Sequence, residues 1–235
     1  MLSPPRDMQI IPPPGSLLYN RLADMTGNQN SISADRSRSL LTAAWMAVLL
    51  GLAMQGLSLL AVRSPNLKVL TTELVQKVSW STLVCTGLAI GMTAAKSRTT
   101  WMGLAGLIAA PAAFMIARTL QKSLAQTLGA VGTGAPPIDV VFLVIAKAIQ
   151  YVLFGVVIGR LTRDGRSSAL ACGLTGLLFG AAMAAVIVGY SLHTSPPAPT
   201  PAIFSRGINE LIFPVGCALI LYASDNVGRR LSQSA

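Results

Sequence analysis

Six long apolar runs divide this chain, and they constrain its fold more than any other feature. They cover residues 39–62, 78–95, 100–120, 138–161, 168–192 and 203–224. Each run is close to the ~20 residues that a helix needs to cross the hydrocarbon core of a bilayer. Backbone polar groups in lipid must be hydrogen-bonded internally, which leaves helices or a closed barrel. The length and continuous apolarity of the runs favour helices.

The composition agrees with a membrane protein. Only 11% of the residues are charged, whereas a soluble domain carries about 25%. We therefore predict an all-α bundle of about six transmembrane helices over residues 39–225, between a polar tail (1–38) and a short basic tail (226–235). The cysteines all fall inside apolar runs and predict no disulfide framework. The first residues, MLSPPRDMQIIPPPG, do not have the pattern of a cleavable signal peptide, so the first run is expected to act as an uncleaved signal anchor.

The N-terminal tail allows two interpretations. Prolines at positions 4, 5 and 12–14 prevent a continuous helix at its beginning. The segment 16–25, SLLYNRLADM, places Leu18, Leu22 and Met25 on one face of a helix, which suits the surface of a membrane. A flexible tail is the alternative.

The distribution of Lys and Arg predicts the orientation. If the N-terminus is inside, eleven of these residues lie in inner segments and five in outer segments. The inner ones are Arg6, Arg21, Arg36, Arg38, Lys96, Arg98, Arg160, Arg163, Arg166, Arg229 and Arg230; the outer ones are Arg63, Lys68, Lys77, Arg118 and Lys122. Because such an excess marks the cytoplasmic side, we expect both termini in the cytoplasm, with a bacterial inner membrane as the expected location. The net charge of +10 is thereby explained without nucleic acid, which is not expected as a partner.

The glycines suggest either a repeat or close helix packing. Their spacing is similar in two hairpins, with Gly87, Gly91, Gly103 and Gly106 in one and Gly155, Gly159, Gly173 and Gly176 in the other. One hypothesis is that the bundle is built from repeated two-helix units. The alternative is that the pairs Gly87/Gly91, Gly155/Gly159 and Gly176/Gly180 simply allow helix backbones to approach closely.

Two charged residues inside the spans are the strongest candidates for a functional site. Lys147 and Glu210 each lie about eight or nine positions into a span, or about 12–14 Å deep at 1.5 Å per residue. A lone charge there costs at least about 2.5–3.5 kcal/mol, so we expect them to form an ion pair. Arg206, one turn before Glu210, is expected to compete for the carboxylate. Gln150 and Asn209 complete the predicted substrate- or ion-binding set.

Two prolines are expected to kink their helices. Pro214 lacks an N–H and crowds the carbonyl of Glu210, four residues earlier, so the predicted kink frees a backbone oxygen beside the carboxylate. Pro111 is expected to do the same near Leu107. The cluster around Lys147 and Glu210 has two interpretations that stay open here: a substrate or proton site, or a structural pin between helices.

Other polar and aromatic residues in the spans give weaker signals. Gln55, Ser79, Ser81 and Thr82 are expected to bond to backbone carbonyls rather than to line a cavity. Trp45, Trp80 and Trp101 are expected to anchor their helices near the membrane interface rather than to bind a ligand. His193 is the only histidine, so a histidine-rich metal site is excluded. Because no catalytic or cofactor motif is present, we expect no enzymatic activity, no cofactor and no metal.

Two classes of function fit these observations. The first is a small transporter or channel for a solute or ion, with its site between the fourth and sixth spans. The second is a non-catalytic subunit or assembly factor of a larger membrane complex, since abundant glycine and short loops suit packing against other chains. The expected partners are membrane lipid, and other membrane subunits or further copies of this chain.

Overall fold

The structure, a computed structural model, describes residues 16–61, 66–93, 97–130, 139–194 and 200–233. Side chains are described within 37–60, 66–93, 97–130, 139–194 and 206–227. The prediction of an all-α fold is confirmed, because every element in these ranges is a helix. The helices are α1 (Ser16–Ala61), α2 (Leu67–Met92), α3 (Arg98–Leu128), α4 (Val140–Arg163), α5 (Ala169–Thr194) and α6 (Thr200–Gln233). The prolines at positions 4, 5 and 12–14, together with residues 62–65, 94–96, 131–138 and 195–199 of the connections, lie outside these ranges.

Five of the six helices are long and apolar enough to cross a membrane. The candidate spans are Ser37–Leu60, Arg98–Leu128, Val140–Arg163, Ala169–Thr194 and Arg206–Val227. Helix α2 has 26 residues, or about 39 Å at 1.5 Å per residue, but its first half contains Glu73, Gln76 and Lys77. It therefore has the length of a span and less apolarity than the others. The chain is an integral membrane protein built as a helical bundle.

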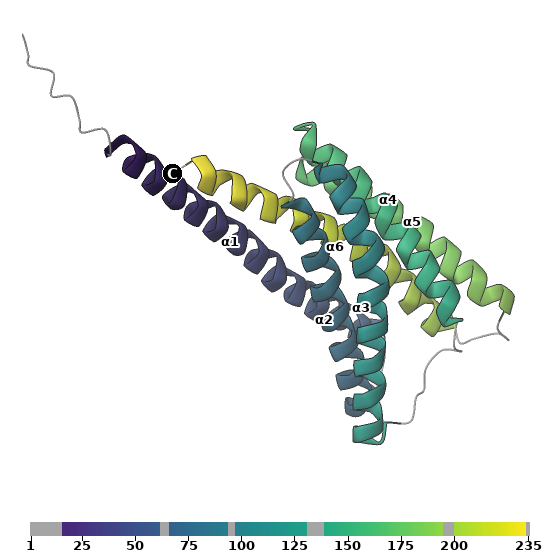
Figure 1. Ribbon diagram of the computed structural model, residues 1–235. Helices are drawn as coiled ribbons and strands as arrows, with labels where there is room; N and C mark the ends of the chain where they lie inside the picture. Colours follow the sequence, from purple (N-terminus) through teal and green to yellow (C-terminus); the bar gives the residue numbers. More distant parts are fainter. Residues whose placement is uncertain (1–15, 62–65, 94–96, 131–138, 195–199, 234–235) are drawn as a thin grey trace, which may run out of the picture.

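Helix α1 continues well beyond its apolar part. It has 46 residues, and the change from polar to apolar sequence near residue 38 falls inside it. The segment 16–25 is helical, while its placement on a membrane surface stays a prediction. Figure 1 shows the first part of α1, in purple, projecting beyond the other helices.

Side-chain caps mark the starts of two helices, and glycines mark the ends of two. Asn66 and Asp139 accept backbone N–H groups at the starts of α2 and α4. Gly129 and Gly165 have φ values of 59° and 68°, which an L-residue rarely adopts, at the ends of α3 and α4. At both ends, the residue after the glycine bonds to the carbonyl five residues back, as in a Schellman motif.

The helices form two layers of three. In the first layer, α3 packs closely against both α2 and α4; in the second, α6 packs closely against both α1 and α5. The layers meet closely along the α1–α2 edge and more loosely between α4 and α5 and between α2 and α6. Figure 1 shows α1 and α6 running beside each other and α2 running beside α3. The two layers therefore pack more closely at the α1–α2 edge than at the α4–α5 edge.

Glycine sets the close approach within the first layer. A Cβ added to Gly106 of α3 would collide with the backbone carbonyl of Tyr151 in α4, and one added to Gly155 would collide with that of Met102 in α3. Lipid tails are as apolar as the helices themselves, so apolar burial adds little to helix association within a bilayer. Close backbone contact supplies the attraction instead.

The glycines of the two similar hairpins have different surroundings. Gly87 and Gly91 of α2 face α3, the next helix, whereas Gly155 and Gly159 of α4 also face α3, the preceding helix. Helices α2 and α3 are packed tightly and α4 and α5 loosely. Close packing therefore accounts for these glycines without a two-helix repeat.

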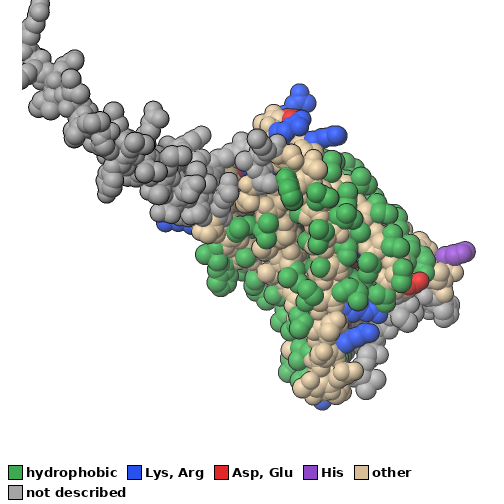
Figure 2. Space-filling view, in the orientation of Figure 1, with side chains coloured by type: hydrophobic (Ala, Val, Ile, Leu, Met, Phe, Trp, Pro, Cys, Tyr) green, Lys and Arg blue, Asp and Glu red, His purple; other side chains and the backbone are tan. Residues whose placement is uncertain are grey.

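Apolar side chains cover the flank of the bundle, and charges gather at its ends. Trp45 and Trp101 are 64% and 53% exposed, and many Leu and Ile side chains point outward with them. Figure 2 shows this apolar surface across the middle of the visible face, with Lys and Arg side chains above and below it. This pattern is the one that a bilayer imposes on a spanning bundle.

Replacing Gly106 with alanine tests the close approach of α3 and α4. The added methyl group is expected to lower the free energy of unfolding by about 1–3 kcal/mol, because neither backbone can yield easily. The matched control is Gly189→Ala in α5, where an added Cβ meets nothing within 4 Å. Thermal unfolding of the detergent-solubilised variants measures both. Equal midpoints for the two variants would contradict the proposed packing.

Candidate functional site

Lys147 and Glu210 form an ion pair between the two layers. The ammonium of Lys147, in α4, bonds to Oε2 of Glu210, in α6. Their side chains are 7% and 18% exposed. The expected pair is therefore present, and each charge is the partner that the other needs inside the membrane. Its role in binding a substrate or ion stays a prediction.

Trp80 supplies a second contact for the Lys147 ammonium. The Nζ atom lies 5.4 Å from the centre of the Trp80 ring, within the range of a cation–π interaction. The expectation that Trp80 anchors its helix near the interface is thus wrong. It rested on a span beginning at residue 78, whereas α2 begins at Leu67 and places Trp80 near its middle.

A cluster of aromatic rings packs beside the ion pair. The ring of Trp80 lies 6.0 Å from that of Tyr151, 5.7 Å from that of Phe213 and 6.3 Å from that of Phe114. Tyr151 also contacts Phe154, at 5.8 Å. These residues come from α2, α3, α4 and α6, so the cluster fills the space between the layers. The surrounding rings lower the local dielectric and so strengthen the charge–charge attraction.

Two polar groups next to Lys147 have unused hydrogen-bonding capacity. Gln150 and Tyr151 follow Lys147 by three and four residues and share its helix face. Gln150 donates to the carbonyl of Phe179 in α5 at 3.4 Å, but its Oε1 atom and the Tyr151 hydroxyl are buried without a hydrogen-bond partner among the described residues. Such groups cost about 1–3 kcal/mol each when left unsatisfied. They offer bonding positions to a polar molecule that enters the interior.

The backbone around Glu210 is held by glycines of α5. Pro214 lies inside α6, so it donates no hydrogen bond to the carbonyl of Glu210. A Cβ on Gly180 would meet the carbonyls of Glu210 and Leu211, and one on Gly176 would meet that of Pro214. The backbone of α5 therefore lies directly against the part of α6 that the proline weakens. Pro111 lies inside α3 and likewise donates no hydrogen bond to the carbonyl four residues earlier, that of Leu107.

Arg206 and Asn209, which also belong to the predicted site, lie near the ion pair but are not part of it. Arg206 is half-buried one turn before Glu210, close enough to be attracted by the carboxylate. The ion pairs found in the described part of the chain nevertheless join Glu210 to Lys147 and not to Arg206. Asn209 is half-buried, and no hydrogen bond of its side chain is present in the described ranges.

The polar side chains of α1 and α2 behave differently from one another. Ser81 donates to the carbonyl of Ala47 at 2.7 Å and so joins α2 to α1, as expected. Gln55 and the hydroxyl of Thr82 were expected to bond to backbone carbonyls in the same way. That expectation is wrong, because both are buried without a hydrogen-bond partner among the described residues.

The arrangement suits the binding of a charged or polar solute. No group of three or more His, Cys, Asp or Glu side chains capable of holding a metal ion occurs in the part of the chain that the structure describes. The site around Lys147 and Glu210 instead offers an ammonium, a carboxylate, an indole face and unsatisfied amide and hydroxyl groups. These can exchange hydrogen bonds and charge contacts with a solute.

A double-mutant cycle on Lys147 and Glu210 measures their coupling. Lys147→Met and Glu210→Met are each expected to lower the free energy of unfolding by about 3–5 kcal/mol, because the other charge stays buried without its partner. The double variant is expected to be more stable than either single variant, since it leaves no buried charge at the site. Thermal unfolding in detergent gives the three values, and additive losses would contradict the pairing.

Comparison with known proteins assigns no family to this chain. No protein-family model matches it, no curated protein matches it, and no solved structure matches it. The properties of the site therefore follow from its own residues: a buried Lys147–Glu210 pair between two helical layers, with Trp80 beneath the ammonium and Tyr151 beside it.

Proposed function

We propose that this protein transports a small polar solute or ion across the membrane. The observation that carries the proposal is the buried Lys147–Glu210 pair, which lies between two layers that pack closely at one edge and more loosely at the other. Ionisable groups inside membrane proteins commonly mark solute pathways. Rocking of one helical bundle against another is a common way for transporters to open alternately to the two sides. The proposal assigns no chemical reaction to the chain.

Charge balance favours a dipolar cargo. A solute that separates Lys147 from Glu210 must replace the partner that each of them loses. A single cation or anion replaces one and leaves the other charge buried alone, which costs about 3–5 kcal/mol. A small molecule with both an ammonium and a carboxylate replaces both, and its ammonium can also occupy the face of Trp80. The cargo class that fits best is thus a small zwitterion.

The orientation proposed with this function places both termini in the cytoplasm of a bacterial cell. The turn between α4 and α5 then lies inside, where Arg163 and Arg166 are exposed. The start of α4 lies outside, and Lys147 is in the outer half of its helix. The supporting observation is the excess of Lys and Arg in the inner segments.

A second function, a subunit or assembly factor of a larger complex, is favoured by α1. This helix begins at Ser16, 21 residues before its candidate span at Ser37, which corresponds to about 32 Å of helix. An arm of this length suits contact with another subunit or a second copy of the chain. Another protein that co-purifies in mild detergent at fixed stoichiometry would favour this function over transport.

Flux measurements on the purified protein in liposomes test the transport proposal. Uptake of labelled glycine is expected to exceed that of acetate and of methylammonium, which carry one charge each. Glu210→Gln is expected to reduce uptake to the level of empty liposomes, whereas Asp164→Asn, at an exposed carboxylate in the α4–α5 turn, leaves it unchanged. If Glu210→Gln lowers the stability but leaves uptake undiminished, the ion pair only fixes α4 and α6 relative to each other, and its role in transport is contradicted.

Reporter fusions test the orientation. An enzyme that is active only in the periplasm, fused after Ala235, is expected to be inactive, whereas the same enzyme inserted between Gly129 and Ala130 is expected to be active. The reason is that the excess of Lys and Arg retains all four inner segments, the C-terminal tail included, in the cytoplasm. Activity of the C-terminal fusion would overturn the proposed topology.

A further inference from the structure

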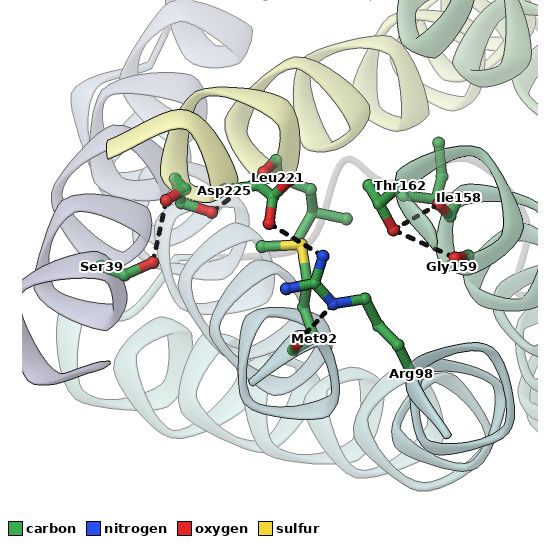
Figure 3. Close-up of polar contacts among 9 residues, drawn as sticks. Ser39, Met92, Arg98, Ile158, Gly159, Thr162, Leu221 and Asp225 are labelled. Carbon is green, nitrogen blue, oxygen red and sulfur yellow. Dashed lines mark hydrogen bonds and ion pairs between the residues drawn. The ribbon is translucent and has the colours of Figure 1, made fainter. Parts of the chain in front are cut away.

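A second ion pair joins the layers at the opposite end of the interior. Arg98, the first residue of α3, contacts Oδ1 of Asp225, in α6, through its Nη1 atom at 3.0 Å. The carboxylate side chain is 5% exposed and the guanidinium side chain 29%. Arg98 also donates from Nε to the carbonyl of Met92, at the end of α2, at 3.0 Å. Figure 3 shows the guanidinium reaching from α3 toward α6 between these two acceptors.

Helix α1 is joined to α6 at the same level. Ser39 donates to the carbonyl of Ser224 at 2.9 Å, and the Ser224 side chain is fully buried. Ser224 itself donates to the carbonyl of Leu221 at 3.1 Å. Figure 3 shows Ser39 and Arg98 approaching α6 from different helices. The contact of α1 with α6 lies within the second layer, whereas that of Arg98 with Asp225 crosses between layers.

The two interlayer ion pairs share one helix. Glu210 and Asp225 are 15 residues apart in α6, or about 22 Å along its axis. Their partners belong to α4 and α3, neither of which is a close packing neighbour of α6 in the described part of the chain. Pro214 lies between the two carboxylates and interrupts the hydrogen bonding of α6. Each end of the interior is therefore bridged by its own charge pair.

We propose that the Arg98–Asp225 pair is a gate that closes the inner end of the interior while the site at Lys147 and Glu210 is closed or opens outward. This inference rests on the proposed transport function. Rotation of the layers about the tight α1–α2 edge separates α3 from α6 and breaks the pair.

The position of Arg98 lets water reach the pair when the layers separate. Its guanidinium is already partly exposed, whereas the Asp225 carboxylate is buried until the layers are apart. Once water enters, both charges are hydrated, so hydration replaces the contact that is lost. An apolar contact of the same size would instead expose apolar surface to water. A gate that opens and closes repeatedly requires a specific contact that hydration can replace.

Cys172 is a natural reporter of this gate. It lies in the first turn of α5, is fully buried, and is close enough to Asp225 to interact with it electrostatically. In a variant carrying Cys85→Ala and Cys217→Ala, Cys172 is the only thiol in the chain. A membrane-impermeant maleimide added to inside-out vesicles then measures access from the inner side, and added to right-side-out vesicles it measures access from the outer side.

Asp225→Asn is expected to increase labelling of Cys172 from the inner side about fivefold, the change in population that ~1 kcal/mol produces. The exchanged pair Arg98→Asp with Asp225→Arg is expected to restore protection. The control, Arg163→Ala with Asp164→Asn, removes an exposed pair at the end of α4 and leaves labelling unchanged. Unchanged labelling in Asp225→Asn would overturn the gate, as would equal access from the outer side.

A loss of folding is separated from gate opening by thermal unfolding of the same vesicle preparations. Faster labelling accompanied by an unfolding midpoint near the labelling temperature would show a structural pin and overturn the gate. Labelling requires no transported cargo, so its outcome is independent of the flux measurements. Flux abolished by Glu210→Gln together with unchanged labelling in Asp225→Asn would retain transport and reject the gate. The expected labelling without any solute flux would reject transport instead.

Discussion

A charge inside a bilayer must be paired, and in this protein that requirement determines how the two helical layers meet. Lys147 and Glu210 belong to different layers, and so do Arg98 and Asp225. In both cases one partner alone would leave a charge in a medium that solvates it poorly. In the described part of the chain the layers are consequently joined across their interior by these two ion pairs, while the close packing lies within each layer and along the α1–α2 edge.

Packing within the layers follows from the lack of a hydrophobic driving force between helices in lipid. Gly106 and Gly155 bring α3 and α4 into backbone contact, and Gly176 and Gly180 do the same for α5 and α6. The contacts are fewer between α4 and α5. The proposed rocking of the two layers would use this distribution of tight and loose contacts.

The chemistry of the interior agrees with this mechanical picture. The Lys147 ammonium has both a carboxylate and an indole face as partners, and the Tyr151 hydroxyl beside it has a hydrogen bond still to make. A fully satisfied polar network would favour a rigid core. The partly satisfied one found here, next to a helix interrupted by Pro214, is what the proposed exchange of contacts with a solute would use.

The sequence by itself determined the membrane class, five helices apolar enough to span the membrane, and the pairing of Lys147 with Glu210. These are properties of local apolarity and of depth along a span, and two opposite charges at one depth have few other partners. Only the tertiary structure decided that α2 begins early enough to place Trp80 under the ammonium, and that Arg98 reaches Asp225. It also decided that α4 packs on α3 rather than on α5. Which residue a side chain faces depends on the rotation and order of the helices, and the packing of all six together fixes both.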